Sequence, residues 1–114
     1  MYKNIQRGVF AALQLDSTDP TTVFTCPAGY QAEVIVSAYN EHTWAIQVTV
    51  WVTEEDGESS FPIFGKSIAT LTGEVIPNST GNKICLAAWD SIQVTAATAD
   101  KIDVVVTWVK YKLS

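Results

Sequence analysis

The chain has little charge and no long apolar run, and each shortage excludes a class of protein. Only 17% of the 114 residues are charged, against about 25% in ordinary soluble domains, so we expect another molecule to cover part of the surface. The lysine and arginine residues are scattered in a chain of net charge −5, and no nucleic-acid partner is expected. No apolar run approaches the about 20 residues of a membrane span, so no membrane partner is expected either.

Cysteine and export signals are also scarce. The two cysteines, Cys26 and Cys85, lack the spacing of a redox motif or a zinc site, and we expect two reduced, packed thiols in preference to a disulfide between them. The first residues, MYKNIQRGVFAALQL, contain neither the apolar core nor the cleavage site of a signal peptide. The length predicts a single domain, residues 1–114, that holds its own core.

Groups suited to catalysis or to metal binding are few, so we predict no catalytic, cofactor-binding or metal site and no enzymatic activity. His42 is the only histidine, and a Ser-His-Asp or Cys-His arrangement would have to be built around it. The acidic segment 54–58, EEDGE, has enough carboxylates for calcium but lacks the spacing of an EF-hand loop. A solvent-exposed hairpin turn at Asp56-Gly57 is favoured for this segment.

Apolar and polar residues alternate with period two along most of the chain, and no segment has the period of a helix. The surest strand is 44–53, where Trp44, Ile46, Val48 and Val50 form one apolar row. The segments 33–39 and 102–109 alternate in the same way. Turn residues separate weaker strands, which are predicted at about 5–13, 21–25, 61–71, 73–76, 83–87 and 91–98.

About eight strands at intervals of about ten residues leave no room for crossover helices, so the strands must pair antiparallel. We therefore predict an all-β fold, an antiparallel two-sheet β-sandwich, with jelly-roll topology preferred and immunoglobulin-like topology as the alternative. Residues 1–15 are predicted to form an N-terminal strand or an arm that reaches a neighbour, because Gly8 interrupts their alternation.

The outward positions of the predicted strands are unusually apolar. Trp44 and Trp108 share a parity with aliphatic rows and are predicted to lie in the core, but Trp51 lies on the side of its strand that would normally face water. Such a composition is typical of a protein contact surface, although a further layer of chain could also cover it. The predicted interface residues are Ile35, Tyr39, Trp51, Val105, Val109 and Tyr111.

Two turn-rich segments carry a resemblance to known proteins. Thr22, Phe24, Thr25, Pro27, Ala28, Gly29 and Asn40 match a T-x-Y/F-T-x-P-A-G lead-in and the strand end that follows it, while Leu86, Asp90, Ile92 and Val94 match an L-x-x-G-D-x-I-x-V turn before a final hairpin. Over about residues 20–111 the chain resembles small virion proteins of tailed bacteriophages. It departs from the pattern at Trp89, where the family prefers glycine. We expect the two segments to lie at the two ends of one sandwich.

The resemblance implies a structural β-sandwich protein located on a virion, such as a capsid decoration or cement protein or a neck or tail accessory, and it implies no catalytic residue. On this basis we expect a homo-oligomer, preferably a trimer, that stabilises the head by bridging subunits of the major capsid protein. The alternative is a carbohydrate-binding module on a tail or neck appendage, which would stack sugars on Trp51 or Trp89.

Overall fold

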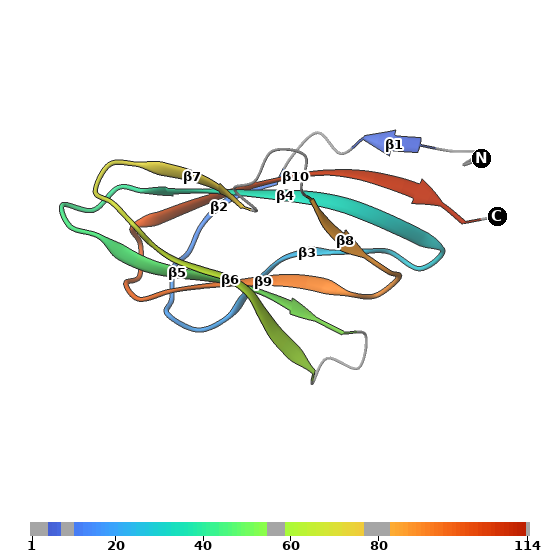
Figure 1. Cartoon of the computed structure of the whole chain (residues 1–114), viewed down its shortest axis with the longest axis horizontal. Helices are drawn as coiled ribbons and strands as arrows, with labels where there is room; N and C mark the ends of the chain where they lie inside the picture. The colour runs from blue at the N-terminus through green and yellow to red at the C-terminus, as the bar shows by residue number, and fades with distance from the viewer. Residues whose placement is uncertain (1–4, 8–10, 55–58, 77–82, 114) are drawn as a thin grey trace.

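The computed structural model shows two antiparallel β-sheets packed face to face, which confirms the predicted β-sandwich (Figure 1). The structure describes residues 5–7, 11–54, 59–76 and 83–113, and these residues form strands, turns and loops with no helix. A membrane-spanning helix, long and apolar, is accordingly not found in that part of the chain.

The first sheet is built around two long strands, β4 (Tyr30–Asn40) and β10 (Ile102–Lys112), which pair antiparallel along their whole length. Short strands line both edges of this pair: β1 (Ile5–Arg7) and β2 (Ala11–Gln14) along β10, and β7 (Gly73–Ile76) and β8 (Ile84–Leu86) along β4. The described residues of the predicted N-terminal strand or arm are thus β1 and β2, at one edge of this sheet.

The second sheet has the order β3-β9-β5-β6. Its strands are β3 (Thr21–Thr25), β5 (Ile46–Thr53), β6 (Ser60–Ile68) and β9 (Ser91–Ala96). The register of β5 with β6 shifts between Val50 and Trp51, so β6 carries an extra residue and bends at this point. The register of β5 with β9 continues without a shift.

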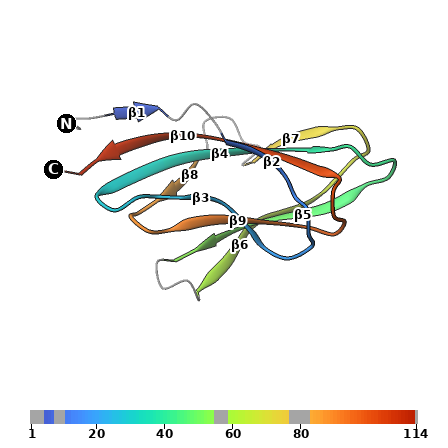
Figure 2. The same ribbon diagram turned by 180° about the vertical axis from the view of Figure 1, so that it is seen from behind.

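The connections identify the topology as the preferred jelly roll. When β1 with β2, and β7 with β8, are each taken as one interrupted strand, the described residues form the eight strands of a jelly roll, and all but one of the connections between these strands pass from one sheet to the other. Seen from behind, β3 and β9 lie beneath the layer of β4 and β10 (Figure 2). An immunoglobulin-like sandwich would instead keep consecutive strands in hairpins more often.

The buried side chains of the core occupy the strand positions that the sequence predicts to face inward. Val34, Val36, Val48 and Val104 are completely buried, and the aliphatic residues in step with them on their strands are buried as well, except Val52, which is partly buried, as is Trp108. Trp108 is half-buried and packs against this core, with its ring 5.1 Å from that of Phe24 between centroids. Burying these rows supplies most of the stabilisation of the fold.

The prediction that Trp44 belongs to the core is wrong. The strand β5 begins at Ile46, two residues after Trp44, and the Trp44 side chain is 65% exposed. Its parity matches the buried row, but parity has a structural meaning only where the chain is extended and paired. The Trp44 indole instead contacts the His42 ring edge-on, 4.3 Å between centroids.

The two segments that carry the family resemblance meet at the same end of the sandwich, and not at its two ends as expected. The N–H of Cys26 donates to the Asp90 carbonyl (2.9 Å), and the N–H of Trp89 donates to the Cys26 carbonyl (2.8 Å). Trp89 has a φ of 69°, in the left-handed region that glycine adopts without strain. A tryptophan in this conformation carries local backbone strain.

Asn40 ties the two sheets together at the opposite end. Its buried Nδ2 donates to the carbonyls of Trp44 and of Ile68, both at 3.0 Å, and its Oδ1 accepts from the N–H of His42 at 2.7 Å. Ile68 ends β6 in the second sheet, whereas Asn40 ends β4 in the first. Because every polar atom of this buried amide has a partner, Asn40 fixes the distance between the sheets.

Candidate functional site

The outer face of the first sheet carries an apolar stripe. In the register of β4 with β10, Ile35 lies diagonally between Val105 and Val109, and Tyr39 lies diagonally beyond Val105, within contact distance for large side chains. Five of the six predicted interface residues thus share one face. Together with Val75 they define what we call the contact face: Ile35, Tyr39, Val75, Val105, Val109 and Tyr111.

Val75 was missed by the sequence reasoning, although the strand that holds it was predicted correctly. It lies opposite Ser37 on the edge strand β7 and is 51% exposed. With Tyr39 and Val105 it lines a shallow hollow of about 260 Å³. The Tyr39 ring lies over Gly73, where an added Cβ would meet the ring at 3.4 Å. The alternation of Glu74 with Val75 is the sequence signal that could have found this position.

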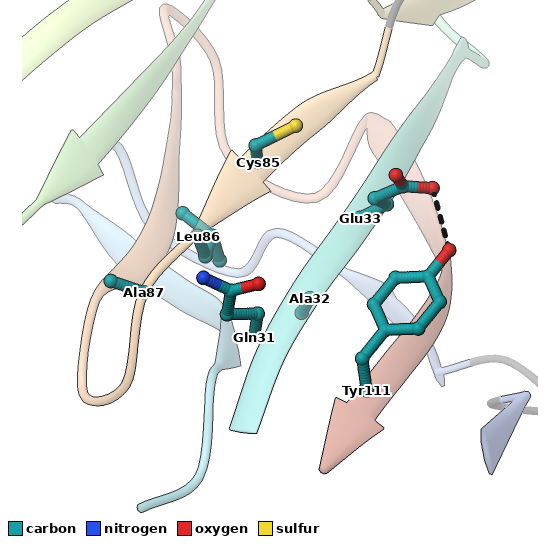
Figure 3. Close-up of a pocket in the computed structure, with 7 residues that line it drawn as sticks. All are labelled: Gln31, Ala32, Glu33, Cys85, Leu86, Ala87 and Tyr111. Carbon is teal, nitrogen blue, oxygen red and sulfur yellow. Dashed lines mark hydrogen bonds between the residues drawn. The ribbon is translucent and has the colours of Figure 1, made fainter. Parts of the chain in front are cut away.

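A polar network borders the contact face at its other end (Figure 3). The Tyr111 hydroxyl donates to Glu33 Oε2 at 3.1 Å, and Lys83 Nζ pairs with the same oxygen at 3.2 Å. Glu33, Tyr111 and Cys85 line a second hollow of about 230 Å³. An apolar centre with paired polar groups around it is the usual anatomy of a protein contact surface.

Two carboxyl groups lie near the opposite border of the contact face. Gln14 Nε2 donates to Glu41 Oε2 at 2.9 Å and to Asp103 Oδ1 at 3.1 Å. Hydrogen bonding with the Asp103 carboxyl, and repulsion from its charge, raise the pKa of Glu41 above its usual range, while Lys101 acts in the opposite direction. At this border of the contact face, the Glu41 carboxyl therefore keeps its proton to a higher pH than an isolated glutamate does.

Trp51 lies on the other side of the molecule from the remaining predicted interface residues. It belongs to β5 in the second sheet, so it cannot share one contact surface with the five residues on β4 and β10. The indole Nε1 donates to Thr95 Oγ1 on β9 at 3.1 Å, and the side chain is half-buried. Around it lies what we call the neutral face: Thr22, Gln47, Thr49, Trp51, Gln93 and Thr95.

The prediction of two packed thiols is correct for Cys26 and wrong for Cys85. Cys26 is buried and its thiol donates to the Tyr30 carbonyl at 3.3 Å. Burial, and to a lesser extent the Asp90 carboxylate, raise the pKa of this thiol, which keeps it protonated and unreactive. Cys85 is exposed because it occupies an outward position on the edge strand β8, opposite Glu33. Neither cysteine forms a disulfide.

The remaining candidate groups are not brought together into a reactive cluster within the described residues. His42 lies in the turn after β4, where its N–H is bound by Asn40 and its carbonyl accepts from the Thr70 hydroxyl. No three histidine, cysteine or carboxylate groups among the residues described could together hold a metal ion. Most of the acidic segment, residues 55–58, lies outside the described residues, but the N–H of Glu54 donates to the Ser59 carbonyl at 2.8 Å and so closes the β5–β6 hairpin.

Comparisons with known proteins identify the fold and no family. No protein-family model matches the chain, and no curated protein sequence matches it. A solved structure of a pilus protein from Bacillus endospore appendages, described as disulfide-linked pili, is similar to 96% of this chain and 89% of its own, with a TM-score of 0.58 and 9% sequence identity. At this identity the likeness shows the fold alone.

Two further solved structures are similar over most of this chain with lower scores. The Eiger tumour-necrosis factor of S. frugiperda has a TM-score of 0.43 with 13% identity, over 92% of this chain and 85% of its own. The VP2 subviral particle of infectious bursal disease virus has a TM-score of 0.35 with 12% identity, over 98% of this chain and 38% of its own. Neither score is high enough to support a functional argument.

Proposed function

We propose that the chain is a structural protein of a bacteriophage particle, a capsid decoration protein that associates with copies of itself through the contact face. The observation that carries this proposal is the apolar stripe across β4 and β10, bordered at one end by the paired charges of Glu33 and Lys83. The match of the 22–29 and 86–94 segments to small phage virion proteins supports the particle as its location.

The proposed mechanism is mechanical and involves no catalysis. Each copy buries its contact face against a sibling in a trimer and uses loops or its N-terminal segment to bridge neighbouring major capsid protein subunits. An interface of about 1,600 Å² per contact is sufficient when it is repeated around a lattice. The charge-poor surface of the second sheet remains available in such an assembly.

The disulfide-linked arrangement described for the Bacillus pili does not suit this chain. Of its two cysteines, Cys26 is completely buried, and only Cys85 is exposed. One accessible thiol per copy can join two copies but cannot continue a covalent filament. We therefore favour non-covalent assembly through the contact face.

The test is the mass of the full chain in solution, measured for two matched variants. Ile35→Glu places a charge in the centre of the contact face and should dissociate the oligomer, a weakening of about 2 kcal/mol or more, as expected for a buried interface residue. Gln47→Glu adds the same charge to the neutral face and should leave the mass unchanged. A reconstruction of the particle should then locate the chain on the capsid. A wild-type protein that is monomeric at all concentrations would contradict the proposal.

A further inference from the structure

The neutral face is not used by the proposed function, and its lack of charge distinguishes it from the rest of the molecule. The chain has 7 basic and 12 acidic residues, yet the four strands of the second sheet contain only one charged residue, Lys66. Lys66 shares the inward parity of Val48, and its ammonium pairs with Glu74 Oε1 at 2.7 Å at the edge between the sheets. No charge of these strands therefore reaches the neutral face.

The polar groups of the neutral face are held in place by each other. Gln93 Nε2 donates to Thr22 Oγ1 at 3.3 Å, and the Trp51 indole donates to Thr95 Oγ1 at 3.1 Å. These bonds cross from β9 to β3 and from β5 to β9, so the groups are aligned over three adjacent strands. A threonine hydroxyl that accepts one bond keeps its own proton and a second lone pair, which remain free to bind a ligand.

The Trp51 indole is anchored to the sheet and only partly buried. Its hydrogen bond with Thr95 runs diagonally to the neighbouring strand, because Trp51 itself lies opposite Gln93. The indole must therefore lean across the sheet, with one part packed on the strands and the remaining part exposed. The face thus offers an apolar ring with hydroxyl and amide groups on its β9 side and Pro62 opposite it on β6, without a cation or an anion.

We propose that the neutral face binds a neutral polysaccharide, with a sugar ring stacked on Trp51 and its hydroxyl groups bonded to Gln93, Thr49 and Thr95. A sugar ring combines an apolar C–H surface with a rim of hydroxyls, and this face has the complementary groups in the same arrangement. An anionic glycan or a nucleic acid would meet no cation here.

The experiment is affinity gel electrophoresis of the full chain through gels that contain dextran, mixed-linkage β-glucan or mannan, with alginate as the anionic control. At least one of the neutral polysaccharides should retard the protein, and alginate should not. Because no charge takes part, the retardation should be the same at low and at high sodium chloride. Failure of all three neutral polysaccharides to retard the protein would overturn the proposal.

Three variants, each checked by thermal unfolding, assign the binding to this face. Trp51→Ala should weaken binding about tenfold or more, the equivalent of roughly 1.4 kcal/mol. Trp44→Ala removes an indole that is exposed elsewhere and should leave retardation unchanged. Thr95→Val keeps the shape of the side chain but removes the acceptor that orients Trp51, so it should cause a smaller loss; it also provides the test if Trp51→Ala does not fold.

The outcomes also separate this proposal from the self-association proposed above. Retention of full binding by a folded Trp51→Ala or Thr95→Val protein would overturn the assignment to the neutral face. A fall in the solution mass of Trp51→Ala, without any polysaccharide binding by the wild type, would show that the face contacts protein instead. A monomeric wild type that still binds a neutral polysaccharide through Trp51 would contradict only the self-association.

Discussion

The two outer faces of the sandwich arise from strands with the same alternation, yet they differ in chemistry. The contact face presents valine, isoleucine and tyrosine in a diagonal stripe, with the ion pair of Glu33 and Lys83 at one border. The neutral face presents threonine and glutamine around the single indole of Trp51 and carries no charge. Alternation determines which side chains face inward, whereas the residue types at the outward positions distinguish the two faces.

The difference also predicts two modes of binding. Apolar area that is removed from water stabilises a contact in proportion to its size and without directional preference, which suits a flat protein–protein contact. Hydroxyl and amide groups stabilise a contact only when their partners match them in direction. The contact face is therefore suited to a partner with a similar apolar surface, and the neutral face to a ligand with matching hydroxyl groups.

The largest expected effect concerns the core that both faces share. Val48→Asp should prevent folding, and so abolish both faces, because a carboxylate would be forced among completely buried side chains at a cost of several kcal/mol. Thr49→Asp, one residue away on the outward parity, should leave the protein folded. Thermal unfolding followed by circular dichroism measures both variants, and equal losses would show that the two parities are wrongly assigned.

A smaller loss is expected where the sheets that carry the two faces are tied together. Asn40→Ala removes three hydrogen bonds and leaves the Ile68 and Trp44 carbonyls without their donor, so the free energy of unfolding should fall by about 3 kcal/mol. Denaturant titration measures this change. The control is Gln31→Ala, which removes an exposed amide from the first sheet and should have little effect. Similar midpoints for both variants would argue against Asn40 as a tie.

The turn at Trp89 should become more stable when its backbone strain is removed. Trp89→Gly places glycine at a φ of 69° and should raise the free energy of unfolding by about 1 kcal/mol, since glycine adopts this conformation without steric cost. Gly29→Ala, at a φ of 79°, should have the opposite effect. Denaturant midpoints of the two variants should move in opposite directions, and a loss of stability in Trp89→Gly would show that the exposed indole makes contacts that outweigh the strain.

The smallest expected effect is a pH dependence of stability that arises beside the contact face. The pKa of Glu41, beside the contact face, is raised by Asp103, so its folded state holds a proton more tightly than the unfolded state. Protonated Glu41 stabilises the folded state fully at a pH below the usual glutamate pKa. This stabilisation is lost as the pH rises through the raised pKa of the folded state. Melting temperature should therefore decline slightly over this mildly acidic range, and Glu41→Gln should abolish that decline. A profile that is unchanged in Glu41→Gln would exclude the pair as its origin.

Several features were predictable from residues that are close in sequence. The strands 21–25 and 73–76 were predicted with their observed limits, and the core parity of Val34, Val48 and Val104 was also correct. These predictions succeeded because alternation over a few residues is a local property of an extended chain with one face buried. The pattern of the phage virion proteins that the chain resembles prefers glycine at position 89, and Trp89 has a positive φ there.

Other features depended on contacts that no short segment contains. Trp44 continues the apolar row of β5 in the sequence, but strand pairing begins only at Ile46 and leaves its indole exposed. Cys85 lies between two buried residues, and its exposure follows from the position of β8 at the edge of the first sheet. The interaction of Asn40 with Ile68 joins residues 28 positions apart.

The sequence by itself determined that this chain is a β-sandwich with one core, because period-two alternation can bury its apolar rows only between two sheets. It also determined which positions of β4, β5 and β10 face outward. Only the tertiary structure decided which of those outward residues lie together, since the pairing of strands joins segments far apart in the chain. That pairing placed Ile35 beside Val105 and Val109 on one face and Trp51 beside Gln93 and Thr95 on the other, and so divided one predicted interface into two surfaces.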